Sequence, residues 1–395
     1  MTRPDSQVST RMPSVAPSAL KSRIDDGEAV TVLDVRTPDQ FQDWHIDGER
    51  VDARNVPFGR FQGGDLPDSV DSLDEDEEVF VVCASGNTSQ SVTRYLSQQG
   101  YDAVNVDGGM TGWALVYEAT EIDADVDATV LQYQRPSSGC MSYLVVDGGE
   151  AAVVDPLRAF TDRYVEDAAE YDADLTYALD THVHADHVSG VRSVAGEADA
   201  DAVVPEPAAE RGIDYDRDYA TVEDGDELAV GDTTIEVIHT PGHTTGMTSY
   251  RVGDVLFTGD GLFTESVARP DLEDGEEGAP DAARMLYDSL QDRVLSLPDD
   301  TIVAPAHFSD AADPAEDGTF TSTLGDLQAS MDALDMDREA FVDYVLEDIP
   351  PRPSNYRRII DTNLGQYRPT DNEAFTLELG PNNCAASRDA MTSDD

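Results

Sequence analysis

Residues 181–187, Thr-His-Val-His-Ala-Asp-His, decide the fold of the larger part of this chain. The stretch follows Leu175–Leu179, an apolar run that predicts a β-strand. Irregular backbone after a strand lets side chains turn the same way, while the strand holds the loop in place. The pattern therefore predicts a metal centre at a strand end, with four donor side chains within six residues: His182, His184, Asp186 and His187.

Three further donors follow in order, each near the end of a predicted strand. His243 lies in TPGH, after the predicted strand Thr233–Ile238. Asp260 lies in TGD, and His307 lies in PAH after the predicted strand Thr301–Val303. Five of the seven histidines of the chain belong to this set. A single histidine more often caps a turn or fills a core, but an ordered set at strand ends favours a metal site.

The ordered motifs HxHxDH, TPGH, TGD and PAH resemble those of the metallo-β-lactamase superfamily, over residues 129–307. The resemblance implies an α+β fold in which two sheets are packed between helices, an αββα sandwich. Hairpins predicted at Asp147-Gly148-Gly149 and Gly253-Asp254 agree with such sheets. The superfamily contains several kinds of enzyme, so the motifs indicate the fold more firmly than the reaction.

The resemblance implies two kinds of site. In hydrolases of the glyoxalase II type, two zinc ions would activate a hydroxide, with His182, His184 and His243 on one ion, Asp186, His187 and His307 on the other, and Asp260 between them. In persulfide dioxygenases, one Fe(II) per chain would be held by His182, His243 and Asp260. This facial triad leaves positions open for the substrate sulfur and dioxygen, and the remaining donors would surround it.

The segment after Asp260 favours the dioxygenase. Residues 268–272, ARPDL, resemble the GRPDL segment of persulfide dioxygenases, with Ala268 in place of glycine. The resemblance implies that Arg269 shapes the substrate side of the site, where its guanidinium would bind a carboxylate of the thiol carrier. A structural salt bridge is the alternative. Residues 350–356, PPRPSNY, also resemble the C-terminal part of these enzymes.

A second candidate site lies earlier in the chain, where Cys83 follows the apolar run Val79–Val82 and precedes a predicted helix. Backbone N–H groups of such a loop, together with the helix N-terminus, would stabilise a thiolate or a persulfide. The predicted cradle consists of the residues after the cysteine: Ala84, Ser85, Gly86, Asn87, Thr88 and Ser89.

With LDVR at residues 33–36 and DGGMTGW at residues 107–113, this region resembles rhodanese-like domains. The resemblance implies a parallel α/β domain in which Cys83 is the nucleophile of a sulfurtransferase. Many such domains carry an arginine where this chain has Ala84 or Thr88, so a sulfur donor less anionic than thiosulfate is expected. The alternative is a module without catalytic activity, which the presence of Cys83 disfavours.

The predicted organisation is a disordered lead-in at residues 1–15, a rhodanese-like domain at residues 16–120 and a metallo-β-lactamase-fold domain at residues 128–395. An acidic, alanine-rich stretch at residues 118–127 is the predicted linker. Residues 323–395 are predicted to form a helical C-terminal region, with helices at Asp326–Leu334, Arg338–Leu346 and Ser354–Gly365.

The chain carries 82 acidic and 25 basic residues, a formal net charge of −57, and a single lysine, Lys21. The acids occur throughout the sequence, which indicates adaptation of a whole surface to a salty cytoplasm of the halophilic archaeal kind. The same charge disfavours binding to nucleic acid or to an anionic membrane. No apolar run reaches membrane-spanning length.

Three cysteines, Cys83, Cys140 and Cys384, are too few for a disulfide framework. The N-terminal region has no apolar signal core, so we expect a cytoplasmic protein. Cys140, beside the first strand predicted for the second domain, is expected to be a small core residue. Cys384 is assigned no role.

We therefore expect a fused enzyme of sulfur oxidation. The second domain would oxidise a low-molecular-weight thiol persulfide with O2 to sulfite, and Cys83 would carry sulfane sulfur between persulfide, thiol and sulfite. The alternatives are a dizinc hydroxyacyl-thiol hydrolase with an attached rhodanese-like domain, and a sulfur-trafficking protein without catalysis. The identity of the thiol carrier, the direction of sulfur transfer and the formation of a homo-oligomer stay open.

The charge predicts that salt stabilises the fold. Repulsion among the acids opposes compaction, and raising the ionic strength from about 0.1 M to about 1 M shortens the Debye length from about 10 Å to about 3 Å. We expect the midpoint of thermal unfolding, followed by circular dichroism, to rise over this range of KCl concentration. An unchanged or lower midpoint would contradict this interpretation of the acidic surface.

Overall fold

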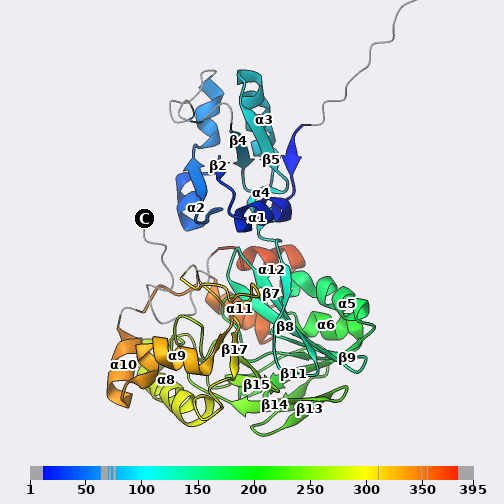
Figure 1. Cartoon of the computed structure of the whole chain (residues 1–395), viewed down its shortest axis with the longest axis vertical. Coiled ribbons are helices and arrows are strands. Elements are labelled where there is room, and N and C mark those ends of the chain that lie inside the picture. The colour runs from blue at the N-terminus through cyan, green and yellow to red at the C-terminus, as the bar shows by residue number, and fades with distance from the viewer. Residues whose placement is uncertain are drawn as a thin grey trace, which may run out of the picture. The chain divides into compact units, whose positions relative to one another are not determined.

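In this computed structural model, the chain forms two compact units that divide between Tyr117 and Glu118 (Figure 1). The structure describes residues 12–63, 70, 73, 77–309, 311–347, 349–353 and 355–380. Each unit has a hydrophobic core of its own, as separately folded domains do. None of the helices in the described ranges is both long and apolar enough to span a membrane.

The first unit is a five-stranded parallel sheet in the order β1-β5-β4-β2-β3, with helices on both faces. Its strands are β1 (Ser14–Val15), β2 (Val30–Asp34), β3 (Val51–Asn55), β4 (Glu78–Val82) and β5 (Asp102–Val106). Its helices are α1 (Pro17–Asp25), α2 (Pro38–Asp43), α3 (Asn87–Gln99) and α4 (Gly109–Trp113), with the 3₁₀ turn η1 (Phe58–Gly63). Because successive side chains of β4 point to opposite faces, Val81 packs into the core under α3, and Phe80 packs into the core under α1 and α4.

The lead-in predicted for residues 1–15 ends earlier than expected. Ser14–Val15 form β1, which pairs in parallel with β5. Asn105 of β5 also donates its backbone N–H to the carbonyl of Pro13. Residues 1–11 lie outside the described part of the chain. The edge of β5 offers backbone hydrogen bonds to a neighbouring segment, and a sequence pattern does not reveal such an edge.

The second unit consists of two sheets packed face to face. One has seven strands in the order β12-β11-β10-β9-β8-β7-β6, and the other has six in the order β13-β14-β15-β16-β17-β18. The strands are β6 (Glu118–Glu121), β7 (Thr129–Arg135), β8 (Cys140–Asp147), β9 (Glu150–Val154), β10 (Asp174–Leu179), β11 (Asp201–Pro205), β12 (Ala220–Val222), β13 (Glu227–Val230), β14 (Thr233–His239), β15 (Thr248–Val252), β16 (Val255–Gly259), β17 (Ile302–Pro305) and β18 (Ser322–Thr323). The helices are α5 (Thr161–Glu170), α6 (Val191–Ala198), α7 (Glu206–Ala209), α8 (Gly275–Ser289), α9 (Leu324–Ser330), α10 (Arg338–Leu346), α11 (Tyr356–Asn363) and α12 (Asp371–Leu377), with the shorter turns η2 (Arg158–Phe160), η3 (Leu290–Val294) and η4 (Asp332–Asp335).

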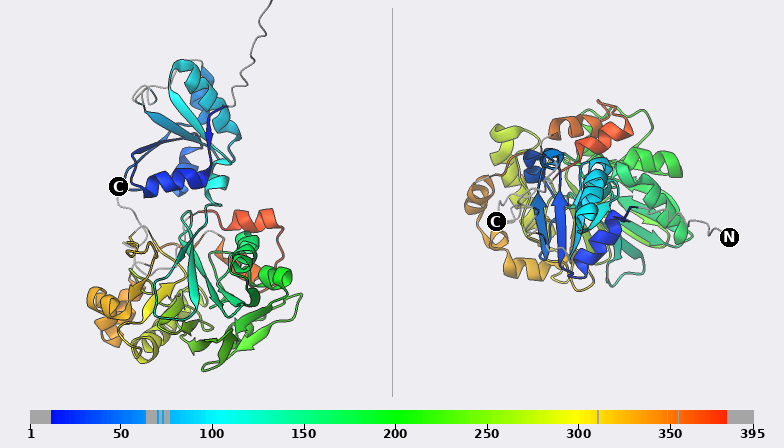
Figure 2. Two further views of the ribbon diagram at one scale, coloured as in Figure 1. Left: turned by 45° about the vertical axis from the view of Figure 1, so that its right-hand side comes forward. Right: turned by 90° about the horizontal axis from the view of Figure 1, so that it is seen from above.

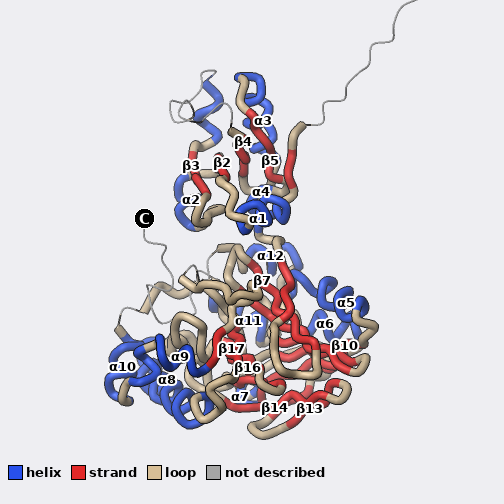
Figure 3. Tube along the Cα trace, viewed as in Figure 1, coloured by secondary structure: helices blue, strands red, loops and turns tan. Residues whose placement is uncertain are grey.

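Helices cover the outer face of each sheet, and this confirms the predicted αββα sandwich (Figure 2, Figure 3). α5 and α6 lie against the seven-stranded sheet, whereas α8 lies against the six-stranded sheet and packs on α10. Tyr143 and Leu179 of one sheet meet Tyr250 and Phe257 of the other in the core between the sheets. The apolar face of each strand is therefore buried, and polar residues concentrate where the strands end.

Two further boundaries differ from the prediction. Glu118–Glu121, expected to be linker, forms β6 and pairs antiparallel with β7, so the second domain begins before residue 128. The helix predicted at Asp326–Leu334 is α9 followed by η4, because Met331 between them has extended backbone. Residues 381–395, which include Cys384, lie outside the described part of the chain.

A buried ion pair holds the C-terminal segment against the sandwich. Arg135 Nη1, at the end of β7, lies 2.6 Å from Glu378 Oε2, and the two side chains are 0% and 1% exposed. Glu378 Oε1 also accepts the backbone N–H of Val188. The rings of Phe160 and Phe375 lie within cation–π distance of the Arg135 guanidinium. One carboxylate therefore links β7, the loop after β10 and the residue that follows α12.

Replacing Glu378 with glutamine removes the negative charge that compensates Arg135 in a buried setting. We expect the free energy of unfolding to fall by about 3 kcal/mol, measured by urea denaturation at constant high salt. Asp371→Asn is the matched control, because Asp371 forms its ion pair with Arg158 while its side chain is 92% exposed. A loss as small as that of the control would contradict the role given to Glu378.

Candidate metal centre and cysteine loop

The donors predicted from the sequence lie where strands of both sheets end. β10 of the seven-stranded sheet leads into residues 181–190, all of which are buried. In the six-stranded sheet, β14 leads to His243, β16 ends directly before Asp260, and β17 leads to His307. The structure brings these side chains into three neighbouring groups.

The ligand atoms of His182, His243 and Asp260 face one another in the first group. The Nε2 atoms of both histidines lie 3.6 Å from Asp260 Oδ2, and all three side chains are buried. Within the described residues, none of these three atoms has a hydrogen-bond partner. Buried polar atoms without partners cost free energy, so this convergent set fits a metal ion.

The protonation of the group suits metal binding. Burial, and after it the neighbouring His184, hold the pKa of His182 well below its ordinary value. Burial also lowers the pKa of His243. For Asp260, burial raises the pKa, but the charge and the hydrogen bond of His307 outweigh burial and bring it below the ordinary value. The group offers two neutral nitrogens and one anionic oxygen, the forms in which these side chains bind metals.

Hydrogen bonds fix the other nitrogen of each histidine. His182 Nδ1 lies 3.0 Å from Thr181 Oγ1, and His243 Nδ1 lies 2.9 Å from the carbonyl oxygen of Arg269. Thr181 Oγ1 in turn donates to Asp155 Oδ2 at 2.8 Å. Such bonds set the tautomer and the ring orientation that direct Nε2 to a metal.

Arg269 supports the site through its backbone. Its guanidinium is buried, with Nε 2.7 Å from Asp271 Oδ1 and Nη1 3.1 Å from the carbonyl oxygen of Pro351. Arg352 binds the other carboxylate oxygen of Asp271. The contact of Arg269 with a substrate carboxylate, expected from the resemblance, is not supported by this arrangement, which favours the structural salt bridge instead.

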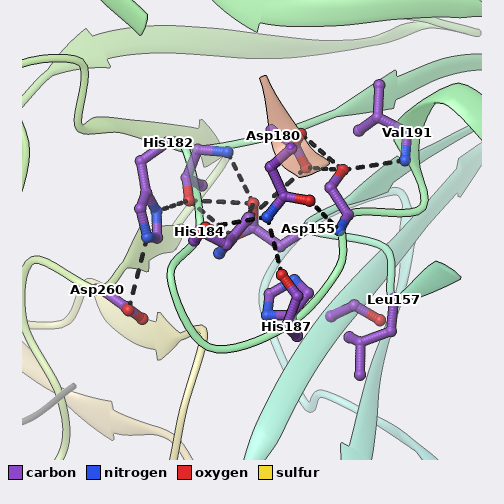
Figure 4. Close-up of polar contacts among 12 residues, drawn as sticks. Asp155, Leu157, Asp180, His182, His184, His187, Val191 and Asp260 are labelled. Atoms are coloured by element: carbon purple, nitrogen blue, oxygen red, sulfur yellow. Dashed lines mark hydrogen bonds and ion pairs between the residues drawn. The ribbon is translucent and has the colours of Figure 1, made fainter. Parts of the chain in front are cut away.

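His184 belongs to a second group, with Asp155 and Asp180 (Figure 4). Its Nε2 lies 2.9 Å from Asp155 Oδ1 and 3.7 Å from Asp180 Oδ1. Asp155 also accepts the backbone N–H of Thr181, and Asp180 accepts the hydroxyl of Ser189. Asp155 was not singled out from the sequence, although it follows the apolar strand β9 just as the predicted donors follow their strands.

Asp186, His187 and His307 gather around Cys140 in the third group. Asp186 Oδ2 lies 2.7 Å from His307 Nε2, 2.9 Å from His187 Nδ1 and 3.3 Å from Cys140 Sγ. His307 Nδ1 also contacts Asp260 Oδ1, at 2.5 Å. Burial and Asp186 raise the pKa of the Cys140 thiol, but His307 and His187 lower it by more. Cys140 is thus buried as predicted for a core residue, yet it lies beside the carboxylate and the two histidines of this group.

Cys83 lies directly after β4 and before α3, and its side chain is buried. Burial raises the pKa of its thiol. Hydrogen bonds from the Ser89 hydroxyl and from the backbone N–H groups of Ser89, Ser85 and Thr88 outweigh burial and lower the pKa below its ordinary value. These partners all belong to the cradle predicted from the sequence. Three of the four hydrogen bonds come from neutral backbone N–H groups.

The other cradle residues shape the loop. The carbonyl oxygen of Ala84 accepts the Thr111 hydroxyl at 2.8 Å, and Asn87 Nδ2 donates to Ser85 Oγ at 3.3 Å. Gly86 has a φ of 77°, and a Cβ there would lie 2.8 Å from the backbone nitrogen of Gly108. Only glycine combines this backbone conformation with such a close approach.

Sequence profiles match both units. The profile of the rhodanese-like domain matches residues 16–115, and the profile of the metallo-beta-lactamase superfamily matches residues 136–307. The chain joins a rhodanese-like domain to a metallo-β-lactamase domain.

Curated relatives exist for each domain. The rhodanese-like domain is 34% identical over 100 residues to the sulfurtransferase-like protein YtwF of Bacillus subtilis, a match covering 25% of this chain and 87% of the relative. The metallo-β-lactamase domain is 31% identical over 183 residues to the mitochondrial persulfide dioxygenase ETHE1 of Homo sapiens, covering 45% of this chain and 66% of the relative. It is also 34% identical over 189 residues to the hydroxyacylglutathione hydrolase of Erwinia tasmaniensis, covering 48% and 64%. The chain therefore spans slightly less than two thirds of the length of the last two relatives.

Asn363 of α11 holds the backbone of the buried loop at residues 181–190, called the metal loop below, in the metallo-β-lactamase domain. Its Nδ2 donates to the carbonyl oxygens of His184 at 2.9 Å and His187 at 2.8 Å. Its Oδ1 accepts the backbone N–H of Ser189 at 2.9 Å. Two carbonyls and one N–H around the amide determine which end carries the nitrogen. Asn363 is far from the loop in sequence, so no local pattern could have assigned it this role.

Replacing Asn363 with alanine leaves two buried carbonyls and one buried N–H of the metal loop without these partners. We expect the bound metal ion to be released to a chelator about 10-fold faster or more, by analogy with other residues that orient metal ligands. Gln366→Ala is the matched control, because Gln366 donates to the carbonyl of Gly212 and not to the metal loop. Equal release rates for wild type and Asn363→Ala would disprove the role.

Proposed function

We propose that the metallo-β-lactamase domain is a persulfide dioxygenase that holds one Fe(II) through His182, His243 and Asp260. The observation that carries the proposal is the convergence of three buried ligand atoms without hydrogen-bond partners in the described residues. Two histidines and one carboxylate are the ligand set of non-haem Fe(II) oxygenases. The similarity to the persulfide dioxygenase of Homo sapiens supports the same reaction.

Hydrogen bonds engage one ligand atom of several donors that a second metal ion would need, whereas His184 Nδ1, Asp186 Oδ1 and His187 Nε2 have no partner within the described residues. Asp186 Oδ2 is shared by His187, His307 and Cys140. His184 Nε2 is bound to Asp155. The proposal of one ion rests on the group of His182, His243 and Asp260, with the other donors forming a shell of hydrogen bonds around it.

Ferrous iron at this position supplies reactivity with dioxygen and a binding position for the terminal sulfur of the substrate. The residues of the chain exclude water from the site and orient the ligands. Burial of His182, His243 and Asp260 excludes bulk water, and the hydrogen bonds that the two Nδ1 atoms donate, from His182 to Thr181 Oγ1 and from His243 to the Arg269 carbonyl, orient the two imidazoles. The overall reaction is R–S–SH + O2 + H2O giving R–SH, sulfite and two protons. Both oxygen atoms of dioxygen and one of water thus enter the sulfite.

We further propose that Cys83 transfers sulfane sulfur in the rhodanese-like domain. A persulfide on Cys83 would be stabilised by the same backbone N–H groups that lower the pKa of its thiol against the effect of burial. The terminal sulfur would pass to a thiol, or to sulfite to give thiosulfate, and Cys83 would leave as the thiolate. Two activities in one chain raise the effective concentration of their shared intermediates.

A dizinc hydroxyacyl-thiol hydrolase is the second candidate. It is favoured by the similarity to the hydrolase of Erwinia tasmaniensis and by the presence of every donor of a two-metal site in order along the chain. In this case a metal-activated hydroxide would attack the thioester carbonyl.

The deciding measurement is oxygen consumption by the Fe(II)-loaded protein at about 1 M KCl, where surface repulsion is screened. Glutathione persulfide and cysteine persulfide are the probes. We expect rapid oxygen uptake, stoichiometric sulfite and about one iron per chain. Absence of uptake together with two zinc ions per chain and hydrolysis of S-lactoylglutathione would replace the proposal with the hydrolase.

Cys83→Ser separates the two domains in the same experiment. We expect sulfur transfer from a persulfide to cyanide to be lost, while oxygen uptake persists. Loss of both activities would mean that Cys83 takes part in the oxidation, and the division of labour proposed above would be wrong.

A further inference from the structure

Cys83 is connected to a buried asparagine through a single hydroxyl group. Ser89 Oγ lies 3.3 Å from Cys83 Sγ and 2.7 Å from Asn105 Oδ1. Ser89 and Asn105 are 0% and 1% exposed. Asn105 comes from β5, the strand beside β4, and it was not among the residues predicted from the sequence to stabilise the sulfur.

The orientation of the Asn105 amide follows from its other contacts. Nδ2 donates to the carbonyl oxygen of Val106 at 3.2 Å and to Asp107 Oδ1 at 3.5 Å. A reversed amide would place its oxygen against these two acceptors. Asn105 therefore presents Oδ1, a group that can only accept, to the hydroxyl of Ser89.

The hydroxyl of Ser89 carries one proton and has two acceptors within reach. The distance of 2.7 Å to Asn105 Oδ1 is the usual length of an O–H···O bond. While Cys83 is a thiol, its S–H can donate to Ser89 Oγ, and the Ser89 proton stays on Asn105. When the thiol proton leaves to solvent, the anionic sulfur has the backbone N–H groups of Ser89, Ser85 and Thr88 as donors, and it gains a further one when the hydroxyl rotates from Asn105 to Cys83.

We propose that Asn105 is a positioning residue that competes with Cys83 for the Ser89 hydroxyl proton and so restrains formation of the reactive sulfur anion. The inference rests on the proposed sulfurtransferase role of Cys83. It is tested on the thiol itself, so that failure of sulfur transfer and failure of the inference give different results.

Charged groups on the neighbouring elements are already paired or exposed. Arg36, after β2, forms an ion pair with Asp34 and donates to the carbonyl of Trp44. Asp107, after β5, contacts the amide of Asn105, and Arg94 of α3 is exposed. Removal of Asn105 should therefore act on Cys83 through Ser89.

The test is the pH dependence of alkylation of Cys83 by iodoacetamide, quantified on the peptide that contains Cys83 by mass spectrometry. A hydrogen bond to a charged group is worth enough to move a midpoint by about one pH unit. We expect Ser89→Ala to raise the midpoint by about this amount and Asn105→Ala to lower it by about half as much. In a protein that already carries Ser89→Ala, adding Asn105→Ala should not shift the midpoint further, because the proposal has Asn105 act on the sulfur through the Ser89 hydroxyl.

Asn55→Ala is the matched control, since Asn55 lies in the same domain and donates to the backbone carbonyls of Asp34 and Arg36. It should leave the midpoint unchanged. If Asn105→Ala does not fold, Asn105→Asp keeps the side-chain volume, and its stronger acceptor should raise the midpoint more in the presence of Ser89 than in Ser89→Ala. A raised midpoint for Asn105→Ala, or equal shifts with and without Ser89, would overturn the proposal.

Discussion

The metallo-β-lactamase domain depends on pairing the backbone of its buried metal loop. Residues 181–190 are irregular and entirely buried, and buried backbone groups must find partners outside the loop. Asp155 binds the N–H of Thr181, Glu378 binds that of Val188, and Asn363 binds three further groups of the loop. Strand β9 and the C-terminal helices thus hold the loop from two sides. His182, the proposed ligand in this loop, is therefore attached to backbone that has little freedom to move.

The same pairing separates three groups of similar side chains. All contain histidine and carboxylate, and in the group of His182, His243 and Asp260 one ligand atom of every member lacks a partner within the described residues. Around it, His184 is bound to Asp155, and Asp186 is bound to His187 and His307. Donor identity alone would allow one or two metal ions. The hydrogen bonds between donors occupy one atom each of His184 and Asp186 and leave His184 Nδ1 and Asp186 Oδ1 without a partner within the described residues.

The rhodanese-like domain stabilises an anion by other means. The chain has a net charge of −57, and two positions that carry arginine in many related domains are Ala84 and Thr88. The Cys83 sulfur is instead stabilised by backbone N–H groups and by the Ser89 hydroxyl. Neutral dipoles of this kind act at short range, so they remain effective when the salt concentration is high.

The sequence by itself determined the fold class of both domains and the set of donor residues. Apolar strands followed by His, Asp or Cys are local patterns, and their order along the chain is distinctive. Tertiary structure decided which donors converge, because pairs such as Asn363 with His187, or Asn105 with Ser89, join residues that no periodicity connects. It also decided that β1 and β6 are strands and that the guanidinium of Arg269 is buried against Asp271. Edge pairing and buried polar contacts depend on which residues lie opposite one another in space. Local patterns in the sequence do not show which distant residues these are.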